Sequence, residues 1–253
     1  LIKKYFSPQA ILQPKSILVE YLQHELLDSL YKQPGSAQLS FMGGTAIRIV
    51  HQGNRFSEDL DFDNFGLSFG DFTTLTQAVI QDMRLKGFIV EFRLVEKGAY
   101  HCYIKFPDIL QTQALAVHSQ EKILLRIDTV HKTKTFAPLV HTLNAFDIYR
   151  DILANPVSIL LAQKLITILE RKRERGRDFY DVSYLYGMTE PDIGYIEQYT
   201  GMNMTEFKKR LLKRCSALNF SVLTKDVAPF LIDQSQQQRV MKFQRFIQDR
   251  FSK

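Results

Sequence analysis

The sequence of 253 residues predicts an α+β fold, with a mixed sheet flanked by helices in residues 1–150 and a helical domain in residues 151–253. Two observations support this division. Before residue 150, short segments in which apolar and polar residues alternate, as in strands, are mixed with segments of helical spacing. After Asn155-Pro156, the apolar residues keep helical spacing and no segment favours a strand.

The first part begins with a helix and then a short strand that ends in two glycines. Pro14 to Lys32 carries apolar residues at helical spacing, and a Pro-Gly-Ser sequence closes the segment. Gln38 to Met42 is a short apolar run that leads into Gly43-Gly44. Thr45 to His51 then favours a helix.

A strand with acidic residues follows. Arg55 to Phe62 alternates, which places Leu60 and Phe62 on one face and Asp59 and Asp61 on the other. The segment from 110 to 119 favours neither helix nor strand. The remaining expected elements are a helix at Phe72 to Lys86, strands at Phe88 to Glu96, Ala99 to Phe106 and Glu121 to Val130, and helices at Val157 to Arg171, Asp178 to Tyr186, Ile193 to Tyr199, Thr205 to Cys215 and Gln236 to Phe251.

The composition is that of an ordinary globular protein. Hydrophobic residues make up 45% and charged residues 24% of the chain, which argues against a disordered protein. The formal charge of +6 is compatible with a polyanionic partner. Cys102 and Cys215 stand outside any CxxC or histidine pattern, so we expect neither a disulfide nor a zinc site. The sequence shows no membrane span and no signal peptide, so we expect a cytoplasmic protein.

The Gly43-Gly44 turn is compatible with a phosphate site. Glycines let the backbone approach a ligand closely, and the N-terminus of the next helix offers unpaired N–H groups and a positive dipole end. Taken alone, the two glycines fit an ordinary strand–helix turn equally well.

Asp59 and Asp61 give a stronger signal. Two carboxylates held side by side repel each other unless a cation neutralises them. Mg²⁺ does so and keeps coordination positions for phosphate oxygens, and two such ions suit the in-line attack of a hydroxyl on an α-phosphorus. The alternative is an acidic edge strand that faces water.

Together, the glycine turn and the carboxylate strand resemble the DNA polymerase β-type nucleotidyltransferase superfamily. The sequences GGTAI and RFSEDLDF, followed much later by K-x6-R-x5-RDFYD, are similar to the AbiEii/AbiGii-type toxin nucleotidyltransferases, which include the MenT toxins. This resemblance covers residues 38–64 and 156–186 closely. It covers residues 65–150 only in the order of strands and helices.

The resemblance implies an enzyme that binds an NTP at the glycine turn. Gly43, Gly44 and Ser57 would contact the phosphates of the nucleotide. Thr45 would cap the helix that follows the glycines, which is also its ordinary structural role.

The resemblance also implies a Mg²⁺ site and a catalytic base. Asp59 and Asp61 would bind the Mg²⁺. A third carboxylate on a later strand would act on the attacking hydroxyl, and Asp128 in KILLRIDTV is the best candidate because it alternates with apolar residues. Glu91 and Asp108 are weaker candidates, and Asp128 fits the start of a turn equally well.

The helical domain is expected to complete the active site. The resemblance gives Lys164, in LLAQKLITILE, a phosphate contact, although a place on the solvated stripe of its helix explains it too. Asp178 and Asp181 share a helix face at i,i+3. The resemblance implies that Asp178 faces the active site and that Asp181 orients Lys164 or an arginine. A local pair between Arg177 and Asp181 is the alternative.

Two basic clusters and the histidines add little. The clusters are either solvated helix surfaces or surfaces that steer RNA. They are the arginines of Arg171 to Arg177 and the Lys and Arg residues of Lys208 to Arg214. His51, His101, His118, His131 and His141 show no metal-binding spacing.

The leading hypothesis is a Mg²⁺-dependent enzyme that moves an NMP from an NTP to an acceptor hydroxyl, with release of pyrophosphate. The resemblance implies a toxin-like role, with the 3′ end of a tRNA, or another RNA, as acceptor and an antitoxin protein as a further partner. The alternatives are a small-molecule or protein acceptor, and a non-catalytic nucleotide-binding module. The retention of both carboxylates with Lys164 and Asp178 argues against the non-catalytic module.

Overall fold

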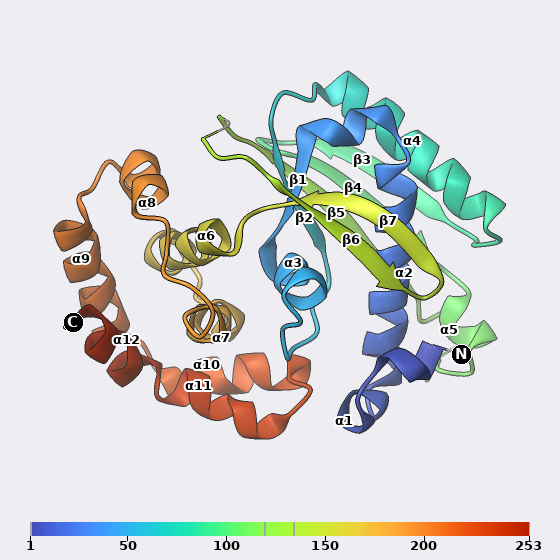
Figure 1. The fold of residues 1–253 in the computed structure, drawn as a ribbon. Helices are drawn as coiled ribbons and strands as arrows, with labels where there is room; N and C mark the ends of the chain where they lie inside the picture. The colour runs from blue at the N-terminus through green and yellow to red at the C-terminus, as the bar shows by residue number, and fades with distance from the viewer. Residues whose placement is uncertain (1, 119, 134, 253) are drawn as a thin grey trace. The chain divides into compact units, whose positions relative to one another are not determined.

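The alternating segments of the first part form one mixed sheet in the computed structural model, which describes residues 2–118, 120–133 and 135–252 (Figure 1). Its strand order is β3-β4-β5-β2-β1-β7-β6. β1 pairs parallel with β7, β2 pairs parallel with β5, and the other neighbours are antiparallel. The strands are β1 (Leu39–Met42), β2 (Leu60–Asn64), β3 (Glu91–Glu96), β4 (Tyr100–Phe106), β5 (Ile123–His131), β6 (Leu139–Ala145) and β7 (Ile148–Ala154). The mixed sheet and its helices confirm the predicted α+β class.

The chain divides into two compact units. The first, which we call the sheet unit, consists of Leu1–Val50 and Phe56–Asn155. The second, which we call the helical unit, consists of His51–Arg55 and Pro156–Lys253. A five-residue segment early in the chain therefore belongs with the C-terminal helices, although its position in the sequence predicts that it belongs to the first domain.

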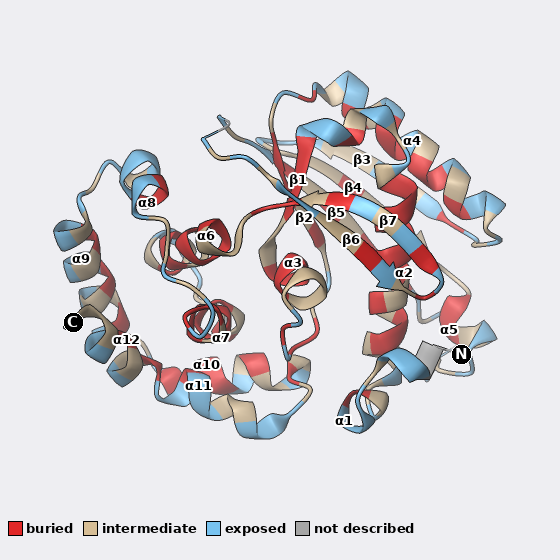
Figure 2. Cartoon of the chain, in the orientation of Figure 1, coloured by how far each residue is buried: buried red, intermediate tan, exposed pale blue. Residues whose placement is uncertain are grey.

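The sheet unit has its apolar core between one face of the sheet and two long helices. Leu22 and Leu26 of α2 and Phe72 of α4 lie in the same cluster of buried residues as Phe41 and Phe62 of the central strands (Figure 2). Burial of so many large side chains supplies most of the stabilisation of such a layer. The helices of this unit are η1 (Ile2–Tyr5), α1 (Pro8–Ile11), α2 (Pro14–Tyr31), η2 (Pro34–Gln38), α3 (Gly43–Val50), α4 (Phe69–Leu85) and α5 (Ile109–Thr112).

The helical unit packs around buried aromatic side chains. Phe179 contacts the rings of Phe220 and Phe243 edge to face at centroid distances of 5.4 and 5.0 Å. Gly176 begins α7 where α10 passes so close that a Cβ would lie 1.9 Å from the Leu223 carbonyl oxygen, so only glycine fits. The helices are α6 (Val157–Glu170), α7 (Gly176–Leu185), α8 (Ile193–Thr200), α9 (Met204–Ser216), α10 (Phe220–Val227), η3 (Ala228–Phe230), η4 (Gln234–Gln237), α11 (Gln238–Met241) and α12 (Phe243–Phe251). None of the helices in the described residues is long and apolar enough to cross a membrane.

The structure corrects several expected elements. The strand expected from Arg55 begins only at Leu60, because residues 55–59 form no ladder with a neighbouring strand. The β6–β7 hairpin and α10 were not expected at all. The hairpin turns through Phe146 and Asp147, which both adopt positive φ (56° and 63°) without the Asn or Gly that usually marks such a turn. The helix expected over 236–251 is broken into η4, α11 and α12.

Candidate active site

The two faces of the sheet carry different kinds of side chain, because buried apolar residues alternate with polar or exposed residues along β5. Ile123, Leu125 and Ile127 are buried on the face that carries the apolar core, so Asp128 points to the opposite face. Asp61 of β2 is paired with Asp128 in the parallel register. The two carboxylates are therefore neighbours on the face away from α2 and α4.

The glycine turn lies directly beside Asp61. Met42, the last residue of β1, pairs with Asp61, and Gly43 follows with a positive φ of 76°. A Cβ at Gly43 would lie 2.5 Å from an Asp61 carboxylate oxygen. Only glycine suits this position, because the backbone has a positive φ and because Asp61 occupies the space where a side chain would lie. Gly44 is buried in the first turn of α3.

Gly43→Ala is expected to destabilise the protein by more than the ~1–2 kcal/mol that an L-residue costs in the left-handed region, because the new methyl group also meets Asp61. Gly98→Ala is the matched control, since Gly98 has a φ of 68° and nothing within 4 Å of its Cβ position. The melting temperatures of both variants measure the difference. Equal losses of melting temperature in the two variants would show that the Asp61 carboxylate causes no additional steric clash at position 43.

Ser57, Asp59 and Thr45 are placed by local hydrogen bonds. Gln23 of α2 donates to the carbonyl oxygens of Ser57 (3.0 Å) and Glu58 (2.9 Å), which fixes the segment before β2. The Thr45 hydroxyl donates to the Asp59 carbonyl. Thr45 is thus the third residue of α3 and not its cap, because α3 already begins at Gly43.

Arg126 and His101 surround the carboxylates, and neither role was predicted from the sequence. Arg126 of β5 binds the Asp59 carboxylate through Nε (3.1 Å) and through its second terminal nitrogen. Its other terminal nitrogen lies 3.5 Å from Asp128, and His101 Nδ1 lies 2.8 Å from the other Asp128 oxygen. The hydrogen bond to Asp59 raises the pKa of Arg126 further above its ordinary value, although burial opposes this. A fixed positive charge therefore lies between two of the three carboxylates.

The donor set suits a hard cation such as Mg²⁺, since carboxylate oxygens are its usual protein ligands. Asp61 and Asp128 are in register, and the guanidinium of Arg126 already takes the place of a cation beside Asp59 and Asp128. Within the described ranges, no three His, Cys, Asp or Glu side chains converge to form a metal site. Asp59 would have to leave Arg126 to join such a group.

In the helical unit, Arg55 and Asp181 form a buried bidentate pair. Both N–O distances are 2.6 Å, and the side chains are 3% and 1% exposed. His51 and Gln52, which precede Arg55, are also bound to α7. The hydroxyl of Tyr184 in α7 donates to the carbonyl oxygens of His51 (2.9 Å) and Gln52 (3.0 Å). Burial would raise the pKa of Asp181, but the charges of Arg55 and Lys164 lower it below its ordinary value.

Lys164 completes this network. Its ammonium lies 2.8 Å from Asp181 and 2.9 Å from Asp178, and Arg171 binds the other oxygen of Asp178 at 2.8 Å. Burial would lower the pKa of Lys164, but the two carboxylates raise it above its ordinary value. The structure therefore places Lys164 in a buried ion-pair network and not on a solvated stripe.

Two of these pairs join residues that are distant in the sequence. Arg126 and Asp59 are 67 positions apart, and Arg55 and Asp181 are 126 positions apart. The hint for Arg126 is that it alternates with apolar residues on the same side as Asp128. The contacts of Asp181 with Lys164 and Arg55 agree with the role of Asp181 that the resemblance implies.

A family model matches this chain, and two solved structures share its architecture. A family model described as "Nucleotidyl transferase AbiEii toxin, Type IV TA system" matches residues 25–247. No curated protein matches the chain. A Helicobacter pylori protein described as a candidate nucleotidyltransferase superposes with a TM-score of 0.57 at 16% identity, over 94% of this chain and 96% of the other. JHP933 from Helicobacter pylori gives 0.55 at 15% identity, over 94% of each chain. MenT4, a nucleotidyltransferase toxin from Mycobacterium tuberculosis, gives 0.48 at 14% identity, over 92% of this chain and 93% of the other.

Proposed function

Because this chain belongs to the AbiEii family of nucleotidyltransferase toxins, we propose that it transfers an NMP from an NTP to the 3′-terminal hydroxyl of a tRNA in a Mg²⁺-dependent reaction. An antitoxin protein that restrains this activity is part of the proposal, since the family is one of type IV toxin–antitoxin systems. Transfer to a small molecule or a protein is the alternative within the same chemistry, and nucleotide binding without catalysis is the alternative outside it.

One observation carries the proposal. Asp61 and Asp128 are register partners on one face of the sheet, and the Gly43 turn adjoins Asp61. The turn offers a close approach for phosphate groups, and the carboxylates offer ligands for a metal and a base for a hydroxyl.

In the proposed reaction, Asp59 and Asp61 would hold Mg²⁺, which when bound neutralises charge on the phosphate oxygens. Asp128 accepts the proton of the attacking hydroxyl, and His101 holds the orientation of its carboxylate. The hydroxyl oxygen forms a bond to the α-phosphorus as the bond to the bridging oxygen of the β-phosphate breaks and pyrophosphate leaves. Gly43, Gly44, Thr45 and Ser57 would position the triphosphate, with Ser57 held by Gln23.

Lys164 and Asp178 are proposed as the contribution of the helical unit to the reaction. Lys164 would contact a phosphate group as a permanent positive charge, which its carboxylate neighbours maintain. Asp178 would face the active site beside Lys164, and Asp181 would orient the Lys164 ammonium through their 2.8 Å contact.

The experiment is a transfer reaction with each of the four α-³²P-labelled NTPs, Mg²⁺ and total cellular RNA plus protein. We expect label on tRNA-sized RNA, and none when Mg²⁺ is replaced by EDTA. Label on protein or on small molecules only would refute the tRNA acceptor. No label with any NTP would support the non-catalytic alternative.

A further inference from the structure

The net positive charge of the protein comes from the helical unit. His51–Arg55 and Pro156–Lys253 contain 18 Lys and Arg against 11 Asp and Glu, a formal charge of +7. The sheet unit contains 15 against 16, a formal charge of −1. A polyanion is therefore attracted to the helical unit, because binding to phosphates depends mainly on such an excess of cations.

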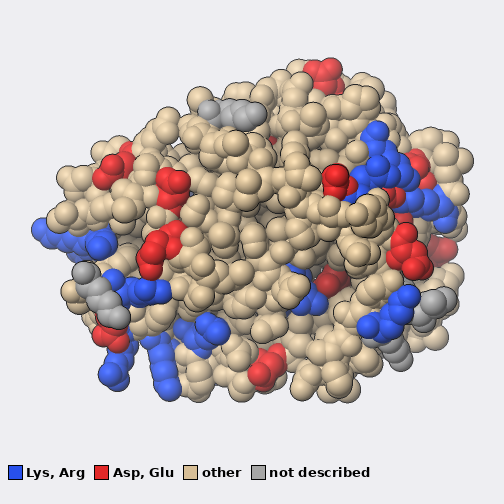
Figure 3. All heavy atoms as spheres, in the orientation of Figure 1, with Lys and Arg blue, Asp and Glu red and all other residues tan. Residues whose placement is uncertain are grey.

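Many of these cations are already paired. Arg55, Lys164 and Arg171 belong to the buried network, and Arg214 binds Glu174 at 3.0 Å. Lysines and arginines visible on the helical unit gather over the C-terminal helices (lower left of Figure 3). A site for a polyanion on these helices must use cations that are not strongly paired with carboxylates.

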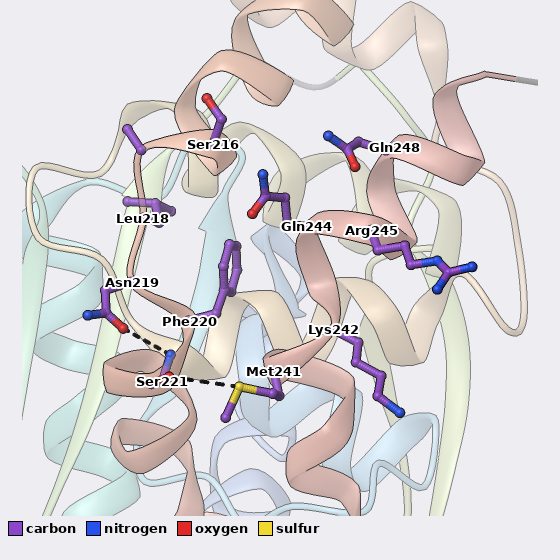
Figure 4. Close-up of a pocket in the computed structure, with 11 residues that line it drawn as sticks. Ser216, Leu218, Asn219, Phe220, Ser221, Met241, Lys242, Gln244, Arg245 and Gln248 are labelled. Atoms are coloured by element: carbon purple, nitrogen blue, oxygen red, sulfur yellow. Dashed lines mark hydrogen bonds between the residues drawn. The ribbon is translucent and has the colours of Figure 1, made fainter.

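A groove of about 620 Å³ in the helical unit offers such cations. Residues 216–221 line one side, and the other side is lined by Met241, Lys242, Gln244, Arg245 and Gln248 (Figure 4). We call it the basic groove, because Lys242 and Arg245 line it and no acidic residue is among the lining residues that the structure describes. Arg245 has Asp249 at 3.8 Å, but both side chains are largely exposed (88% and 70%), so this pair is weak.

The other lining groups suit a nucleotide chain. Gln244, Gln248 and Asn219 provide amides. The ring of Phe220 lies between the two sides in Figure 4 but is buried against Phe179 and Phe243, so the exposed apolar surface comes from Met241. Lys242 and Arg245 match phosphates, as the cations of sites for single-stranded nucleic acid do, and the amides can form hydrogen bonds with the edges of bases.

We propose that the basic groove binds the phosphodiester backbone of the RNA acceptor, with Lys242 and Arg245 each neutralising a phosphate. This inference rests on the proposed function for its choice of RNA over an acidic protein. It locates an RNA contact on α11 and α12 that does not involve the carboxylates of the sheet unit.

The test is the binding of 5′-fluorescein-labelled bulk tRNA to the full chain, measured by anisotropy at several salt concentrations without NTP. Lys242→Gln with Arg245→Gln removes two charges from the groove. Lys97→Gln with Lys225→Gln is the matched control, since both lysines are exposed, do not line the groove and lie outside the two basic clusters of the sequence. Circular dichroism melts of both double variants check folding.

The groove variant is expected to bind tRNA about tenfold more weakly, with the slope of log K against log salt reduced by about 2, while the control changes much less. Equal losses in both variants, no loss in the groove variant, or no tRNA binding by the wild-type protein would each overturn the proposal. Competition by poly-glutamate as strong as that by poly(U) would assign the groove to an acidic protein.

The transfer reaction and the RNA site in the basic groove can be refuted independently of each other. If the wild-type protein labels tRNA but the groove variant binds it normally, the groove is refuted and the proposed function stands. If nothing is labelled but the groove variant alone loses tRNA binding, the RNA site stands and the transfer reaction is refuted.

Discussion

Asp61→Asn is expected to lower kcat/KM for nucleotidyl transfer at least about a thousandfold, because metal stabilisation of the phosphate charge is worth several kcal/mol in the transition state. The fold should survive. Asp61 is a register partner of Asp128, so loss of its charge relieves repulsion between neighbouring carboxylates in the metal-free protein. Initial rates and a thermal melt measure the two effects.

Asp59→Asn is expected to abolish transfer equally and to lower the stability slightly. Its carboxylate is held by Arg126, and the partly exposed pair is worth at most about 1 kcal/mol. Glu58→Gln is the matched control, since Glu58 is an exposed carboxylate next to Asp59. Wild-type rates in Asp61→Asn, or an equal loss in Glu58→Gln, would refute the metal assignment.

Asp181→Asn is expected to cost about 3–5 kcal/mol of unfolding free energy, far more than the loss of the partly exposed Asp59 carboxylate. Removal of one partner of a buried pair leaves the other charge without compensation. The guanidinium of Arg55, 3% exposed, would lose the charge of its carboxylate partner, and the ammonium of Lys164 would keep only Asp178. Chemical denaturation followed by circular dichroism measures the change.

Glu206→Gln is the control for Asp181→Asn, since Glu206 pairs with Arg210 at the surface and should contribute less than about 0.5 kcal/mol. The pKa of Asp181 is depressed in the folded protein, so its contribution is present above the unfolded pKa of about 4 and is lost as pH falls through the lower folded value. Asp181→Asn should therefore remove part of the acid sensitivity of the protein. A loss under 1 kcal/mol would show that the pair is not essential for stability.

The pattern of apolar residues predicted most of the architecture. The long helix α2 and strands β4 and β5 lie within a few residues of the predicted boundaries, because strong periodicity reflects burial on one face. The β6–β7 hairpin was not predicted, because its turn places Phe146 and Asp147 at positive φ without the Asn or Gly that usually marks such a turn.

For the candidate site, the sequence pointed to the acidic and glycine residues and to Lys164, but not to Arg126 or Arg55 as partners of the carboxylates. Asp59 and Asp61 stand out because two carboxylates two positions apart are costly without a cation. Arg126 and Arg55 did not stand out, because the fold alone brings a distant arginine to a carboxylate. Their roles depend on strand register and helix packing, which a single sequence does not specify.

The assignment of His51–Arg55 to the helical unit has a consequence for how this sequence can change over time. Position 55 lies four residues before Asp59, yet its physical partner is position 181. Substitutions at 55 should therefore covary with substitutions at 181 and not with those at 59. A recombination event that exchanged everything after residue 155 would separate Arg55 from its partner, so the two units should be inherited as one evolutionary block.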